Sequence, residues 1–121
     1  MAFNWFKKKT QDNSKENLPD FSRIDSNEKA LDLYNKKELE KIYLMPLEFG
    51  GEDNLLNVIY APIFTKTLKD KFDLMAENLL EEGKKLNYSA IPEYKGDSFI
   101  ASKLILNITG DTNFKETINI W

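Results

Sequence analysis

The sequence predicts an α+β fold, a mostly antiparallel sheet of about five strands with one long helix packed on one face. Three observations support this fold class. Residues 62–83 carry the only long helical pattern, strand-like segments precede and follow it, and the C-terminal third alternates apolar and polar residues around turn sequences. The expected order of elements is α-β-β-α-β-β-β.

The helix at residues 62–83 is predicted from its apolar spacing. Pro62 suits the first helical turn, where its missing N–H has no intrahelical partner, and Gly83 is a typical residue just after a helix end. The apolar stripe is expected to pack on the sheet, with the charged residues on the opposite side. Its members are Phe64, Leu68, Phe72, Met75 and Leu79, with Leu80 widening it.

Residues 1–24 are predicted to be a flexible N-terminal tail, which leaves residues 25–121 as a single α+β domain. The tail is polar and aperiodic after residue 6 and contains a proline. Its beginning combines three aromatic residues, Phe3, Trp5 and Phe6, with the lysines at positions 7–9. That combination allows weak contact with a membrane surface, although a frayed or packed arm is the simpler interpretation.

Before the long helix, a short helix is expected at residues 26–39, because Asp25 or Ser26 can cap it. Two strands are then expected at residues 41–49 and 55–61. The glycine-rich turn between them predicts a hairpin with a loop of about five residues.

After the long helix, three strands are expected. Residues 86–94 form the weakest candidate, because Pro92 cannot donate a hydrogen bond to a neighbouring strand. Residues 98–109 and 114–121 form the clearest hairpin. Its buried face is expected to hold Ile100, Leu104, Leu106 and Ile108 from one strand and Phe114, Ile118 and Ile120 from the other.

Composition excludes several kinds of chemistry. The chain contains no cysteine and no histidine, which removes disulfides, thiolate nucleophiles, Cys/His zinc sites and Ser–His–Asp triads. The net charge is −3 and Arg23 is the only arginine, so nucleic-acid binding is not expected. We also expect no cofactor and no resident metal, and a cytoplasmic location.

Two loops contain more charged residues than a simple turn requires. Residues 47–54 place carboxylates around two glycines, which is compatible with a divalent-cation site but also with an ordinary solvated turn. Residues 91–99 offer a mixed set of polar side chains. If the two loops lie at one end of the sheet, they form an acidic surface suited to a basic protein partner. The candidate partner-binding residues are Glu48, Glu52, Asp53, Glu93, Tyr94, Lys95 and Asp97.

The segments YLMPLEFGGED at 43–53 and PEYKGDSFIASK at 92–103, together with FKKK at 6–9, resemble small bacterial α+β proteins of the polymorphic-toxin immunity type. The resemblance implies a cytosolic, non-catalytic protein that binds a partner. It assigns no role to individual residues.

The leading functional hypothesis is therefore a non-catalytic, immunity-like protein-binding module for a toxin or another basic protein. One alternative is a small enzyme or metal-dependent protein that uses Glu48, Glu52, Asp53 or Glu93. A second is a peripheral membrane protein that uses residues 1–9. A monomer or weak homodimer is expected, because an edge strand near the C-terminus invites pairing with a second copy.

Overall fold

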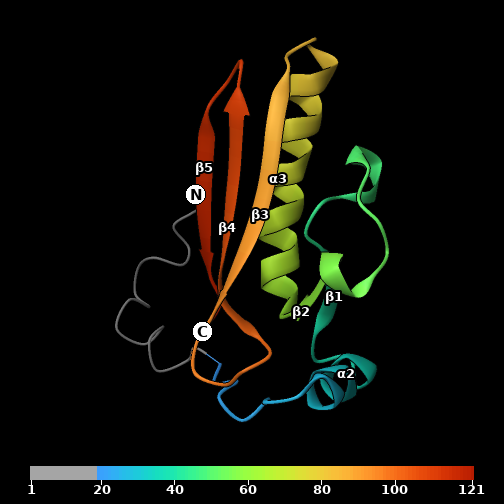
Figure 1. Cartoon of the computed structure of the whole chain (residues 1–121), viewed down its shortest axis with the longest axis vertical. Coiled ribbons are helices and arrows are strands. Elements are labelled where there is room, and N and C mark those ends of the chain that lie inside the picture. The colour runs from blue at the N-terminus through green and yellow to red at the C-terminus, as the bar shows by residue number, and fades with distance from the viewer. Residues whose placement is uncertain (1–18) are drawn as a thin grey trace.

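The computed structural model describes residues 19–121 and confirms the α+β class and the order of elements (Figure 1). The elements are α2 (Asn27–Asn35), β1 (Glu40–Tyr43), η1 (Leu47–Phe49), η2 (Leu55–Asn57), β2 (Val58–Ala61), α3 (Ile63–Glu81), β3 (Leu86–Tyr94), β4 (Ala101–Gly110) and β5 (Phe114–Asn119). The predictions for Phe3, Trp5, Phe6 and the adjacent lysines fall outside the described residues.

The five strands are all antiparallel but divide into two sheets. β3, β4 and β5 form a three-stranded meander in that order, and β1 pairs with β2 in a separate hairpin. Pro92 is tolerated because β3 is an edge strand, where one side of the backbone has no neighbouring strand to bond. Figure 1 shows the hairpin and α2 near the N-terminal end of α3, while β5 lies on the other side of the helix.

The long helix packs on the three-stranded sheet as predicted, but its buried face is rotated from the predicted stripe. Phe72 is buried, whereas Phe64 and Leu68 are 37% and 43% exposed. The remaining buried positions of α3 are Thr65, Lys69 and Ala76. Phe72 and Ala76 pack on the β4 side of the core, and α3 also contacts β1 of the hairpin, so its buried face is shared between the two sheets.

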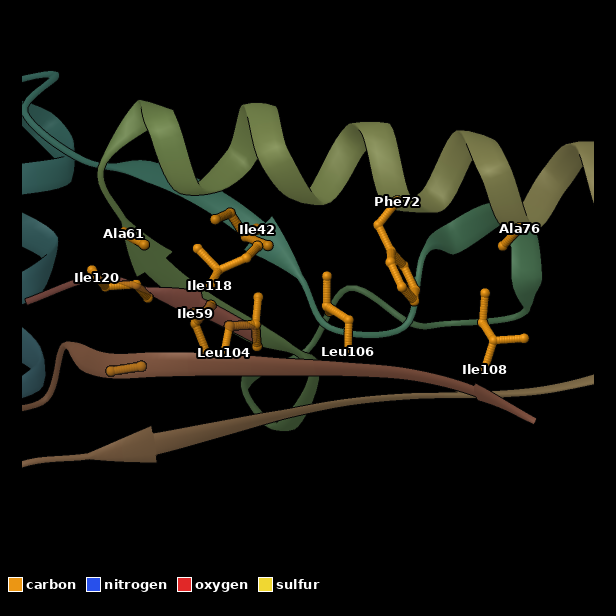
Figure 2. Close-up of a cluster of buried hydrophobic side chains, with 11 residues drawn as sticks. Ile42, Ile59, Ala61, Phe72, Ala76, Leu104, Leu106, Ile108, Ile118 and Ile120 are labelled. Carbon is orange, nitrogen blue, oxygen red and sulfur yellow. The ribbon is translucent and has the colours of Figure 1, made fainter. Parts of the chain in front are cut away.

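The core lies between α3 and the sheet. In Figure 2, Phe72 and Ala76 point from the helix toward Leu106 and Ile108 of β4. At the other end of the core, the hairpin contributes Ile42, Ile59 and Ala61, which lie beside Leu104, Ile118 and Ile120. The hairpin is therefore joined to the main sheet by side-chain packing alone, and both sheets share one core.

The packed part of the chain begins before residue 25. The ring of Phe21 meets the ring of Trp121 edge-on, with centroids 6.3 Å apart. The carbonyl of Ile24 accepts a hydrogen bond of 2.7 Å from the Phe99 amide. Trp121 in turn donates from Nε1 to the carbonyl of Ile100 at 2.9 Å, so the segment before α2 is fixed against the C-terminal end of the chain.

The predicted strands at 41–49 and 55–61 are too long. Pairing covers only residues 40–43 and 58–61, and the connection between them spans residues 44–57 with two 3₁₀ turns. Pro46 keeps the first strand from extending to residue 49, because it cannot donate to the ladder. The side chain of Asn57 delays the second strand by bonding the backbone across the loop.

The core assignment makes a direct stability prediction. Replacing the fully buried Ile108 by alanine should lower the free energy of unfolding by about 2–5 kcal/mol, through lost burial and the cavity that remains. Ile91→Ala is the matched control, because Ile91 also lies on a strand but is 55% exposed. Urea denaturation of both variants measures the difference, and equal losses would contradict the burial pattern.

Candidate functional site

The loop at residues 44–57 is held in one conformation by the side chain of Asn57. Its Oδ1 accepts a hydrogen bond of 2.7 Å from the Met45 amide. Its Nδ2 donates to the carbonyls of Met45 and Glu52, both at 2.9 Å. One amide side chain therefore forms hydrogen bonds with three backbone groups, two of Met45 and one of Glu52. In a longer hairpin, strand pairing would supply such bonds.

Close packing restricts the same loop further. A Cβ added to Gly51 would lie 1.9 Å from the carbonyl oxygen of Met45, so only glycine fits at that position. Gly50 has a φ of 100°, in the left-handed region that closes the η1 turn. Asn54 caps η2 by accepting a hydrogen bond of 3.0 Å from the Leu56 amide. The glycine pair and the asparagines therefore shape the loop.

The ordered loop holds large apolar side chains in solvent. Leu55 and Leu56 are 80% and 91% exposed, and Leu47 at the other 3₁₀ turn is 46% exposed. Burying a leucine side chain in a core is worth roughly 1.5–3 kcal/mol, so the fold gains nothing from their exposure. Neighbouring exposed apolar residues on a fixed loop are typical of a contact surface.

The three predicted carboxylates of this loop have different surroundings. Glu48 lies on η1 and faces the space beside α3. Glu52 accepts a hydrogen bond from Asn54 Nδ2 at 3.1 Å. Asp53 forms an ion pair of 3.0 Å with Lys41, and this hydrogen bond lowers the pKa of the Asp53 carboxyl.

The predicted residues of the second loop also have different surroundings. Glu93 lies on β3 opposite Lys103, and Tyr94 follows it at an irregularity in the pairing. The Nζ atom of Lys95 lies 4.4 Å from the centre of the Trp121 ring, a cation–π contact. Asp97 is exposed in the turn. Lys95 therefore supports the C-terminal packing, while Tyr94 is half exposed and faces a groove.

That groove lies between the observed 44–57 loop and the second predicted loop. It has a volume of about 390 Å³, and Leu55 from the 44–57 loop and Tyr94 and Phe99 from the second predicted loop line it, whereas no residue of the predicted 47–54 loop does. The rest of its lining comes from α2 and the hairpin, namely Asn27, Ala30, Val58, Ile59 and Tyr60. Burial in this region raises the pKa of Tyr94. The two loops thus share a surface, but the groove between them is apolar and aromatic rather than acidic.

A buried polar network lies under the opposite side of the 44–57 loop. Lys69 of α3 is 2% exposed, and its Nζ donates to Asp73 Oδ2 at 2.7 Å and to the hydroxyl oxygen of Tyr88 at 3.0 Å. The Tyr88 hydroxyl donates to the other oxygen of Asp73. Each group thereby gains a partner for its buried polar atoms.

Burial controls the protonation of this network. It lowers the pKa of Lys69, an effect that the hydrogen bond to Asp73 opposes. Burial and the neighbouring Asp73 carboxylate raise the pKa of Tyr88 far above its usual value. A tyrosine that holds its proton this firmly is a poor general base, and Lys69 is occupied by two partners, so the network fastens α3 to β3.

Above this network lies a cleft of about 370 Å³ between α3 and the hairpin. Its walls are apolar in part, and the charged residues that line it are Lys41, Glu48, Lys66, Lys69, Asp70, Asp73 and Glu77. Its three lysines form ion pairs with Asp53, Asp70 and Asp73, respectively. Across residues 19–121, no lysine or arginine forms a salt bridge with Glu48 or Glu77.

The carboxylates of the two loops do not converge as metal ligands. In the described part of the chain, no group of three or more Asp and Glu side chains is arranged to hold a metal ion. Within residues 19–121, neither helix has the length and apolar character needed to cross a membrane. The local geometry instead offers an apolar groove and a charged cleft on either side of one fixed loop.

Sequence reasoning missed three features of this region. Leu55 and Leu56 were expected to lie in a strand, and Asn57 is the residue that explains why they do not. Lys69 was expected on the solvent side of α3, although its spacing of four residues from Asp73 signals a helical ion pair. The groove depends on contacts between segments far apart in sequence, so no local pattern marks it.

A comparison of the chain with protein-family models, with curated proteins and with solved structures gives no match.

The buried ion pair should show strong coupling in a double-mutant cycle. Lys69→Met leaves the Asp73 carboxylate without its cation and should cost about 3–5 kcal/mol of stability. Adding Asp73→Leu removes the unpaired charge, so the double variant should be less destabilised than the single one. Chemical denaturation of the wild type, both single variants and the double variant measures the coupling, and simple additivity would contradict it.

The raised pKa of Tyr88 predicts a loss of stability at alkaline pH. Above about pH 10 the unfolded chain releases the tyrosine proton while the folded protein retains it, so ionisation favours unfolding. The free energy of unfolding of the wild type, minus that of Tyr88→Phe, should therefore decline between about pH 9.5 and about pH 11. The subtraction cancels the contributions of the other tyrosines. A difference that stays constant over this range would contradict the assignment.

Proposed function

We propose that this protein is a non-catalytic binding module that holds a basic protein partner against the 44–57 loop and the adjoining groove. The observation that supports the proposal most directly is the exposure of Leu55 and Leu56 on a loop whose backbone is fixed by Asn57. Folding alone does not require this arrangement, whereas a contact surface does.

Pre-organisation favours binding at this loop. A flexible loop loses conformational freedom when it binds, and that loss weakens the complex. Here Asn57 and Gly51 fix the loop in the folded state, so Leu55 and Leu56 are presented without that loss. Tyr94 and Phe99 add aromatic surface next to Leu55, and aromatic side chains are often the strongest contributors to protein interfaces.

Charge favours a basic partner. Residues 1–18 carry a net charge of +2 out of −3 for the whole chain, so residues 19–121 carry −5. Glu48 and Glu52 lie exposed on the 44–57 loop itself and carry part of this negative charge. Complementary charge increases the rate at which a basic partner associates and selects against acidic ones. An immunity-like protein that masks a basic toxin fits this description.

The proposal predicts that one stoichiometric protein is captured from a lysate of the cells that make this chain. Leu55→Ser/Leu56→Ser and Phe99→Ser should each abolish that capture, because they remove the apolar contact area. Ile63→Ser is the matched control, since Ile63 is 59% exposed on α3 and lies outside the groove lining. Mass spectrometry identifies the captured protein, and calorimetry with the purified protein gives the loss in affinity.

The melting temperatures of these variants show whether a loss of capture reflects binding or folding. All four positions are more than half exposed, so the variants should melt close to the wild type. The proposal is wrong if no stoichiometric partner appears, or if the partner binds Leu55→Ser/Leu56→Ser as tightly as it binds the wild type.

A further inference from the structure

The cleft beside α3 and the groove beside Leu55 flank the two paired strands of the hairpin. Residues 41–43 of β1 line the cleft, and residues 58–60 of β2 line the groove. β1 and β2 are hydrogen-bonded neighbours, so the two hollows lie within one strand's width of each other.

The charges of the cleft do not cancel. The Lys41–Asp53 pair, with 3.0 Å between Nζ and Oδ1, is partly exposed, and so is the Lys66–Asp70 pair at 3.0 Å. The Lys69–Asp73 pair is buried at the base of the cleft. Glu48 and Glu77 are the lining carboxylates left after this pairing, one on η1 and one on α3. The lining residues carry three positive and four negative charges, and Asp53, which pairs with Lys41, adds one more negative charge beside the cleft.

The walls between these carboxylates are apolar. Leu74 of α3 is 56% exposed and Leu47 of η1 is 46% exposed, and both line the cleft with Tyr43. A lysine or arginine side chain has an aliphatic stem and a charged end, and it binds best where its stem meets apolar surface and its end meets carboxylates. An anion would meet an unfavourable excess of negative charge at this place.

We propose that the cleft is the docking site for a basic side chain, arginine or lysine, of the protein partner. The stem would lie against Leu47 and Leu74, and the charged end would lie between Glu48 and Glu77. This inference rests on the proposed function, because the groove that the partner covers lies next to the cleft. The inference extends the proposed function by naming the type of side chain, arginine or lysine, that the partner inserts into the cleft.

The test uses a small probe and therefore does not require the partner. N-acetyl-arginine amide is titrated into the full-length ¹⁵N-labelled protein and followed by NMR chemical shifts. The amide signals of Leu47, Glu48, Leu74 and Glu77 should shift together and saturate at millimolar probe. N-acetyl-citrulline amide has nearly the same shape without the charge, and it should bind at least about tenfold more weakly, because it loses the charge-assisted hydrogen bonds.

Matched variants separate the cleft from the overall acidity of the domain. Glu48→Gln/Glu77→Gln should weaken binding of the arginine probe at least about tenfold. Glu81→Gln/Glu82→Gln changes the net charge equally at the end of α3, outside the cleft lining, and should leave the probe's affinity within about twofold, since an exposed charge outside the site contributes little. A thermal melt of each variant confirms that the fold is retained.

Three results would overturn the proposal. The first is binding of the citrulline probe as tight as that of the arginine probe. The second is an equal loss of affinity for the arginine probe in both pairs of variants, and the third is the same set of shifts with inorganic phosphate in place of the probe. None of these results bears on the capture of a protein by Leu55, Leu56 and Phe99. Failure of the cleft and failure of the proposed function are therefore distinguishable.

Discussion

The face that α3 turns toward the core is the constraint on which the rest of the structure depends. Phe72 and Ala76 cover β4, and this contact fixes the rotation of the helix over the three-stranded sheet. Once that rotation is fixed, Lys69 and Asp73 face β3, where the Tyr88 hydroxyl meets them. The same rotation leaves room beside α3 for the hairpin, which closes one end of the core with Ile42 and Ile59.

The hairpin can carry an irregular loop because it lies outside the hydrogen-bond ladder of the main sheet. No backbone ladder joins β1 and β2 to β3, β4 and β5, so the connection at residues 44–57 is free of the register of the larger sheet. Asn57 supplies locally the hydrogen bonds that a longer ladder would have provided. The scaffold and the proposed contact surface are thus built by different parts of the chain, a common arrangement in binding proteins.

The sequence predicts the parts of the fold that depend on period and turn chemistry. The alternation around Leu104 and Ile118 specifies the C-terminal hairpin correctly, and the helix at 62–83 is recognised from its spacing and from Pro62. The rotation of that helix is not predictable in this way, because its buried face includes the polar residues Thr65 and Lys69, and Lys69 finds its partner Tyr88 on a distant strand. Local periodicity contains no information about such contacts.

The candidate site is less predictable than the fold for the same reason. The sequence draws attention to charged residues such as Glu52 and Asp97, which lie exposed in their loops. It draws no attention to Leu55, because the apolar pattern predicts a strand there. The hydrogen bonds of the Asn57 side chain hold this segment in the loop instead. Tyr94 stands among polar residues in the sequence, yet in the structure it lines the apolar groove together with Leu55.

The Lys69–Asp73–Tyr88 network also determines which of several similar packings the helix adopts. Sliding α3 along β3 by one turn would place Thr65 and Lys69, or Asp73 and Glu77, where Lys69 and Asp73 now lie. Lys69 and Asp73 belong to the same helix, so their ion pair would survive either shift. The Tyr88 hydroxyl, however, would no longer lie between a lysine that donates to it and a carboxylate that accepts from it, so at least one of its two hydrogen bonds to a charged group would be lost, at roughly 1.5–3 kcal/mol. The hydroxyl group of Tyr88 thus favours one position of α3 along the sheet.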